Sequence, residues 1–266
     1  MTCMSATWND QRACPAVLLA ASCWLAGCGT VELKLSERIK GPDYQPANIH
    51  RLPDGVPAQV RRVAVLPLVA DSRGAQAVAG AEVMQSVLLG ELTRAGTFEI
   101  VAVNAEDLIH ATGRGQWRAE EQIPASLLHH MRENLGCEAV LFSRLTQYRA
   151  YPPLAVGWSF KLVECPAKTG TTPRILWAAD EVFDAGNPAV VNSARRHYLA
   201  QLQSPGPLAE SQTAVTSPRR FAQYTLHALS LTIPARAISP QVPPPAADVP
   251  SETKPNNPAP GAGGSE

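Results

Sequence analysis

The sequence has few charged residues and no block of one sign. Lysine and arginine number 23, as do aspartate and glutamate, so the formal net charge is zero and charged residues make up 17% of the chain. Domains that bind nucleic acid concentrate positive charge, because phosphate neutralisation supplies much of their affinity. The charge balance therefore argues against a nucleic-acid partner.

The sequence also lacks a hydrophobic run that could span a bilayer. Its longest apolar stretch, residues 13–27, has about fifteen residues, and a membrane-spanning helix needs about 20. The stretch follows a polar start with Arg12 and ends in small residues, which is typical of a secretory signal. We therefore expect residues 1–27 to be a signal peptide that begins at Met1 or at Met4.

The end of this signal indicates a lipid anchor. Leu25, Ala26, Gly27 and Cys28 resemble the bacterial lipobox, in which the cysteine is lipidated and becomes the mature amino terminus. Gly29 follows, and in lipoproteins of this type the absence of aspartate there favours the outer membrane. The resemblance implies an outer-membrane lipoprotein that faces the periplasm.

Few cysteines remain after this processing. Of the six in the chain, three lie in the signal and Cys28 takes lipid, which leaves Cys137 and Cys165. In an oxidising compartment the two can form a disulfide if the geometry allows. A hairpin centred on Tyr151 would place them directly opposite each other, with Phe142 beside Phe160. The alternatives are this disulfide and two separate buried thiols.

Composition divides the remaining chain into three parts. Residues 28–59 are polar and proline-rich, and they predict either a linker or an irregular strap along the domain. Residues 60–232 should form the globular periplasmic domain. Residues 233–266 are dense in Pro, Ala and Gly with almost no large apolar side chain, so we expect a disordered tail.

The domain alternates strand and helix patterns. Strands are predicted at residues 61–70, 97–103, 138–149, 155–165 and 174–184. Helices are predicted at residues 76–95, 105–112 and 124–135, with two more that begin at Asn187-Pro188 and Ser217-Pro218. Two β-α units followed by an antiparallel meander define an α/β fold: a mixed sheet of about five strands with helices packed against it.

The order of these patterns resembles a known family of envelope domains. "RRVAVLPL" precedes a long amphipathic helix, then come "FEIV", "LGCEAVLFSRLTQY" and "GWSFKLVECPAKTGTTPRILWAADEVFD". The pattern over residues 60–205 is similar to the domain shared by the curli secretion lipoprotein CsgG, the TolB amino-terminal domain, LpoB and PelC. The resemblance implies a non-catalytic module that contacts other envelope proteins or forms rings. Pore-forming members carry long amphipathic insertions, and the short turns here disfavour a secretion pore.

Chemistry-bearing motifs are absent from the sequence. Asp180, Glu181 and Asp184 could serve as general acid and base, but neighbours on a strand point to opposite faces. His129 and His130 are adjacent on a helix, about 100° apart, which is poor geometry for a metal. We expect no catalytic residue, no metal and no cofactor. The aromatic residues Trp158, Phe160, Trp177 and Phe183 are assigned to the core, the alternative being a ligand platform. The arginines Arg195, Arg196, Arg219 and Arg220 are assigned to a solvated surface, the alternative being contact with phospholipid headgroups or with an acidic partner.

The sequence thus predicts a lipid-anchored, non-catalytic interaction module for envelope assembly or export. Its partner is an unidentified envelope protein or a second copy of the chain. The alternatives are a hydrolase acting on cell-wall or surface glycan, and a secretion-pore subunit.

Overall fold

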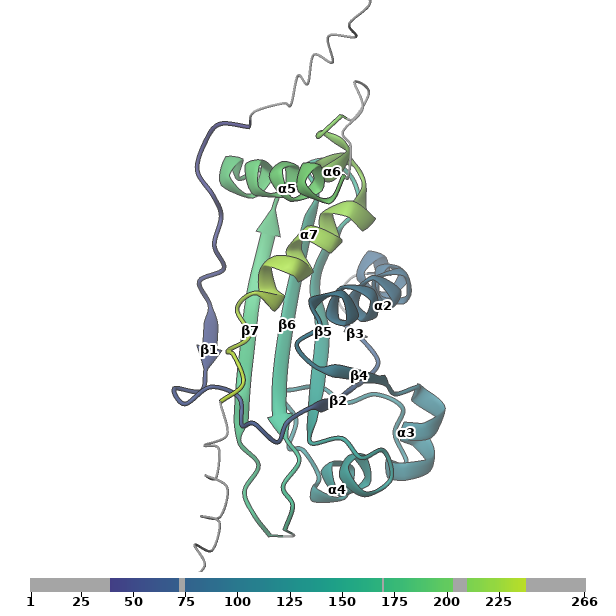
Figure 1. Ribbon diagram of the computed structural model, residues 1–266. Helices are drawn as coiled ribbons and strands as arrows, with labels where there is room; N and C mark the ends of the chain where they lie inside the picture. The colour runs from purple at the N-terminus through teal and green to yellow at the C-terminus, as the bar shows by residue number, and fades with distance from the viewer. Residues whose placement is uncertain (1–38, 72–74, 169, 203–209, 238–266) are drawn as a thin grey trace, which may run out of the picture.

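Seven strands form one mixed sheet with helices packed against it, which confirms the predicted fold class with two strands more than expected (Figure 1). This is a computed structural model, and it describes residues 39–71, 75–168, 170–202 and 210–237. The strand order is β1-β7-β6-β5-β2-β4, and β3 pairs with β5 beside this path. The strands are β1 (Ile49–Arg51), β2 (Arg62–Val65), β3 (Val69–Ala70), β4 (Glu99–Ala102), β5 (Ala139–Arg149), β6 (Ala155–Glu164) and β7 (Ile175–Asp184).

The two additional strands have separate origins. The apolar run at residues 61–70 gives both β2 and β3, because Pro67 has no amide proton to continue the ladder. β1 comes from the segment assigned to the tether, and it pairs antiparallel with β7. β2 pairs parallel with β4 and β5, whereas β5, β6 and β7 form the predicted antiparallel meander.

The helices begin where the sequence places their capping residues. The side chain of Asn104 accepts a hydrogen bond from the Asp107 amide at 2.7 Å, and Asn187 and Ser217 cap their helices in the same way. The helices are α2 (Ala75–Ala95), α3 (Ala105–Thr112), α4 (Ala125–Glu133), α5 (Pro188–Gln201), α6 (Thr213–Thr216) and α7 (Pro218–Ser230). The short α6 was not predicted.

The larger core lies between one face of the sheet and helices α2, α5 and α7. Trp158, Phe160, Trp177 and Phe183 are all buried there, which confirms their assignment to the core. The indole N–H of Trp158 donates to the hydroxyl of Thr225 in α7 at 2.9 Å, so this large ring is buried without an unpaired polar atom.

A smaller core covers the other face. Alternate residues of the central strands, such as Val140 and Phe142, pack there against Leu108 of α3 and Leu128 of α4. The central strands are therefore covered on both faces, whereas the outer face of β7 is open to solvent at Asp180 and Val182. Figure 1 shows α3 and α4 together at the end away from α5.

The register of the β5–β6 hairpin differs from the predicted one. Ala139 lies opposite Glu164, and Phe142 lies opposite Lys161 rather than Phe160. The register also shifts between Leu145 and Gln147, where one strand carries an extra residue. Next to the turn, Arg149 pairs with Ala155, so the hairpin is centred on Pro152 and not on the predicted Tyr151. This places each partner two residues from its predicted position, and the extra residue in β5 then reduces the difference to one, so the predicted register was wrong.

Residues 39–52 run along the free edge of the sheet as a strap. In Figure 1 this segment descends from the end of the molecule that carries α5 to β1, at the opposite part of β7. Of the two alternatives for the tether, the structure therefore gives the strap for these residues. After α7 the chain returns to the same region, where the Ala237 amide donates to the Val56 carbonyl at 2.7 Å. The rest of the predicted tail, residues 238–266, lies outside the described residues.

Candidate functional site

The three carboxylates singled out in β7 do not converge. Asp180 is exposed on one face of the strand, and Glu181 points to the strap. Asp184 accepts a hydrogen bond from Arg149 at 2.8 Å and another from the Gly186 amide at 2.7 Å. Two of the three are therefore held by structural contacts, and they do not form the carboxylate pair that general acid–base hydrolysis requires.

Glu181 is the main attachment point of the strap. Its carboxylate accepts a hydrogen bond from the Tyr44 hydroxyl at 2.6 Å and bonds from the amides of Ala47 and Asn48 at 2.8 and 3.1 Å. Burial, together with the carboxylate of Glu181, raises the pKa of Tyr44 well above its usual value, so its hydroxyl stays a donor. The Tyr44 ring packs edge-on against Phe183 with centroids 5.3 Å apart.

Arg196 of α5 holds the beginning of the strap. Its guanidinium donates to the carbonyls of Ile39, Gly41 and Pro42 at 2.9 to 3.3 Å and also pairs with Asp43. A fork of five N–H donors suits this arrangement, which a lysine could not reproduce. Ser193, one turn earlier in α5, accepts from the Tyr44 amide at 2.8 Å. Arg196, predicted to be a solvated surface residue, is therefore a structural contact.

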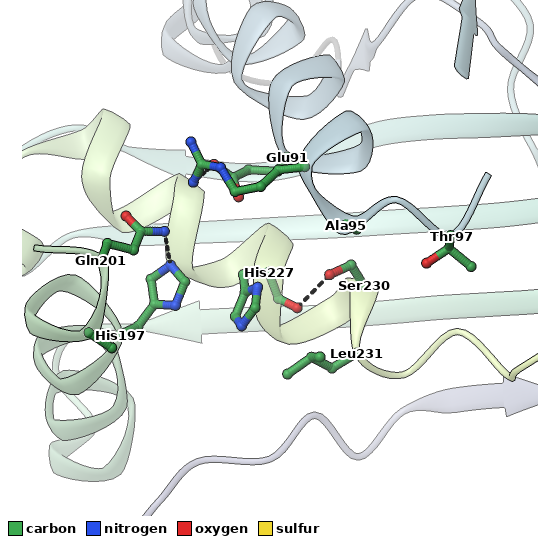
Figure 2. A pocket seen from close by; sticks show the side chains of 10 residues that line it. Glu91, Ala95, Thr97, His197, Gln201, His227, Ser230 and Leu231 are labelled. Carbon is green, nitrogen blue, oxygen red and sulfur yellow. Dashed lines mark hydrogen bonds and ion pairs between the residues drawn. The ribbon is translucent and has the colours of Figure 1, made fainter. Parts of the chain in front are cut away.

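A cavity of about 400 Å³ lies between α2, α5 and α7 (Figure 2). His197 of α5 and His227 of α7 lie side by side in its wall, with ring centroids 4.4 Å apart, and His197 is hydrogen-bonded to Gln201 at 2.8 Å. Burial lowers the pKa of His197 to about 4 and also lowers that of His227. Both imidazoles are therefore neutral at neutral pH.

One buried carboxylate lines the same cavity. Glu91 of α2 is 4% exposed and pairs with Arg94 at 2.9 Å, and burial raises its pKa above the ordinary value. Sequence reasoning missed this group, although a glutamate on the apolar stripe of a helix is a signal that could have found it. Among the described residues no three His, Cys, Asp or Glu side chains are arranged to hold a metal ion. A single paired carboxylate beside two neutral imidazoles gives no complete hydrolytic centre.

A second groove of about 490 Å³ lies where β2 ends, between the start of α2 and the loop that precedes α4. Leu68, Val78 and Ala81 supply its apolar lining, and Glu82 and Arg118 its charges. Val78 is 57% exposed, and Val83 on the same helix is 53% exposed. These two valines are the largest exposed apolar side chains of α2, and they lie beside a groove lined by both apolar and charged side chains.

The two cysteines of the domain are buried free thiols in the same small core. The Cys165 amide donates to the Glu138 carbonyl, so the residue opposite Cys165 is Glu138 and not Cys137. Burial raises the pKa of Cys137 to about 11 and that of Cys165 to about 12. Of the two alternatives, the structure therefore has separate buried thiols, because the register that would pair the sulfurs is not formed.

Other sequence candidates are dispersed. His129 is exposed and His130 half-buried on α4. Cys28 and the lipobox residues Leu25, Ala26 and Gly27 lie outside the described residues, so lipidation stays a prediction. No helix in the described part of the chain is long and apolar enough to cross a membrane.

Comparison with known proteins finds similarity in solved structures alone. No family model matches the sequence, and no curated protein matches it. The PelC dodecamer from Paraburkholderia phytofirmans aligns at 15% identity and a TM-score of 0.34, covering 68% of this chain and 97% of that one. Lipoprotein GNA1162 from Neisseria meningitidis aligns at 18% identity and a TM-score of 0.34, covering 56% of this chain and 100% of that one. The LpoB C-terminal domain from Salmonella enterica aligns at 20% identity and a TM-score of 0.32, covering 48% and 85%. These similarities are low in both sequence and structure.

Proposed function

We propose that this chain is a lipid-anchored, non-catalytic module of the bacterial cell envelope, held at the outer membrane and facing the periplasm. It acts by contact with an envelope protein or with a second copy of itself. The observation that carries the proposal is the strap. From Ile39 onward the chain that leads away from Cys28 is fixed to α5 and β7 by Arg196 and Glu181. The chain from the anchor therefore joins the domain at one end, which leaves the rest of the domain surface for contact with a partner.

The use of the charged side chains supports the non-catalytic part of the proposal. Glu181 and Asp184 hold backbone and side-chain donors, and the buried Glu91 is paired with Arg94. A glycan hydrolase needs two carboxylates placed on either side of the scissile bond. Within the described residues neither cavity is lined by two carboxylates.

The connections between the long strands support a contact module over a pore subunit. Residues 150–154 join β5 to β6, and residues 165–174 join β6 to β7. A transmembrane β-strand needs about 9–11 residues, so neither connection could supply a two-stranded hairpin across a bilayer.

Membrane fractionation of a Cys28→Ala variant tests the anchor. The wild type should take up labelled palmitate and sediment with the outer membrane, and the variant should do neither. Cys23→Ala is the matched control, because Cys23 lies in the apolar run of the predicted signal and should leave both results unchanged. A wild type without label, or a Cys28→Ala variant that is still lipidated, would refute the anchor.

Complementation of a deletion strain tests the non-catalytic assignment. Glu91→Gln and Asp180→Asn keep the side-chain shape and remove the carboxylate, and both should restore the envelope as well as the wild type. Loss of complementation by either variant, at normal abundance and membrane location, would indicate catalysis at that residue.

A further inference from the structure

The direction of the strap determines which end of the domain lies nearest the anchor, given the lipidated Cys28 of the proposed function. The strap begins at Ile39, beside Arg196 of α5, and reaches Leu52, whose amide donates to the Leu176 carbonyl at the start of β7. β7 has 10 residues, so at about 3.3 Å per step the strand is about 30 Å long, and the strap runs along most of it. Figure 1 shows the strap entering at the α5 end.

The length of chain between Cys28 and Ile39 favours one orientation. The eleven residues from Cys28 to Ile39 span at most about 40 Å. The opposite end of the domain could meet the membrane only if this segment ran back along nearly the whole of β7. The α5 end, where the strap begins, is therefore the end that the proposed anchor holds nearest the membrane.

This same end carries a surplus of positive charge. Arg195 donates to Ser211 beside α6, and Arg220 lies over the Tyr198 ring at 5.7 Å. Arg149 and Asp184 form an ion pair at the end of β7, so they add no net charge to this end. We define the basic end as these five side chains: Lys40, Arg195, Arg196, Arg219 and Arg220. Asp43 and Glu210 are the acidic residues beside them, which leaves a surplus of three positive charges.

Three of these side chains are exposed without an ionic partner in the described part of the chain, although the guanidinium of Arg220 also donates to the Gln223 side chain at 3.1 Å. Lys40, Arg219 and Arg220 are exposed, and within the described residues none of them forms an ion pair. Arg219 and Arg220 occupy the first turn of α7, where the helix dipole disfavours positive side chains, so intrahelical stability does not account for them. Arginine and lysine in this setting suit phosphate groups.

We propose that the basic end docks on the anionic phospholipid headgroups of the leaflet that holds the anchor. The acyl chains keep the domain at the membrane, and the contacts of Lys40, Arg219 and Arg220 fix its orientation. The surface with α3 and α4 then points away from the membrane, where a partner can reach it.

Binding of the unlipidated mature chain to vesicles tests this docking. Residues 28–266 with Cys28→Ala should bind vesicles of phosphatidylethanolamine with about a quarter phosphatidylglycerol, and should not bind pure phosphatidylcholine. The binding should weaken as salt is raised, because screening shortens the reach of the charges. The double variant Arg219→Gln/Arg220→Gln should bind about 25-fold more weakly, from about fivefold per arginine near an anionic surface.

The control removes the same charge from the other end. Arg51 and Arg61 are exposed and lie beside β1 and β2, so Arg51→Gln/Arg61→Gln should bind as the unsubstituted chain does. Equal weakening in both double variants, or equal binding to neutral and anionic vesicles, would overturn the proposal. Unchanged vesicle binding by Arg219→Gln/Arg220→Gln would also overturn it and assign the basic end to an acidic protein. Because the acyl chain is absent from these assays, their failure is distinct from a failure of the anchor.

Discussion

Replacing Glu181 by Ala is expected to release the strap from the edge of the sheet. The variant removes the acceptor for the Tyr44 hydroxyl and for the Ala47 and Asn48 amides at once. Hydrogen bonds to a charged group contribute about 1.5–3 kcal/mol each when they are buried. Ala47 and Asn48 are exposed, and water replaces part of the loss, so we expect the strap to be destabilised by about 2–3 kcal/mol.

Hydrogen exchange measures this opening directly. A change of 1.4 kcal/mol is tenfold in an equilibrium constant, so amides protected by strap closure should exchange about 30- to 100-fold faster. The reporters are the Tyr44 amide, which donates to Ser193, and the Asp180 amide, which donates to the Asn48 carbonyl at 3.1 Å. Central residues of β5 should keep wild-type protection, because they belong to the buried core.

Asp180→Ala is the matched control for this experiment. It removes a carboxylate from the adjacent residue of the same strand, but Asp180 is exposed and does not contact the strap through its side chain. The rates of hydrogen exchange of residues 39–52 in the Asp180→Ala variant should match those of the wild type. Unchanged exchange in Glu181→Ala, or an equal increase in both variants, would refute the assignment of Glu181 as the attachment point.

Two further predictions concern buried titratable groups. Since the pKa of His197 is about 4 in the folded chain against 6.5 ordinarily, the unfolded state binds more protons between these values, and stability is lost as pH falls from about 6.5 towards 4. His197 is only half-buried, so solvent screening reduces the effect. Between pH 7.5 and 4.5 the free energy of unfolding, measured by urea unfolding, should therefore fall by about 1–2 kcal/mol more in the wild type than in His197→Gln, with His129→Gln as control. Equal losses would contradict a half-buried, neutral His197, and the raised pKa of Glu91 opposes the trend in both proteins. Cys137 and Cys165 should resist alkylation at pH 8 in the native chain, because both thiols are buried and their pKa values are raised. In denaturant both should react without prior reduction. Rapid labelling of the native chain, or a disulfide-linked peptide pair, would contradict two buried free thiols.

The helices could be predicted because their signals are local. Asn104, Asn187 and Ser217 accept hydrogen bonds from amides two or three residues ahead, and such caps can be read from adjacent letters. The long strands were equally visible from their β-branched and aromatic residues. The short α6 was missed because four residues show no periodicity.

The sequence left the strap as one of two alternatives, and its path could not be predicted because its contacts are long-range. The Ala47 amide bonds to Glu181 across 134 residues, and Arg196 reaches the Ile39 carbonyl across 157. Residues 39–48 have no apolar period, so their sequence favours an irregular path without indicating where that path lies. The hairpin register was wrong for a different reason: the turn is centred on Pro152 and not on Tyr151, and neither this centre nor the shift between Leu145 and Gln147 is indicated by the composition of the strands.

The folded structure also determines where the charged side chains lie. The chain totals zero, so a surplus of three at the basic end leaves a deficit of three on all other residues together. A uniformly basic protein adsorbs to an anionic surface in many orientations, whereas a neutral chain with a local surplus of positive charge is attracted at that end. The described residues outside the basic end comprise 13 basic and 15 acidic side chains, so the rest of the domain is close to neutral. A zero net charge, which argues against a nucleic-acid partner, therefore does not oppose the proposed docking, because that docking depends on the local surplus around Arg219 and Arg220.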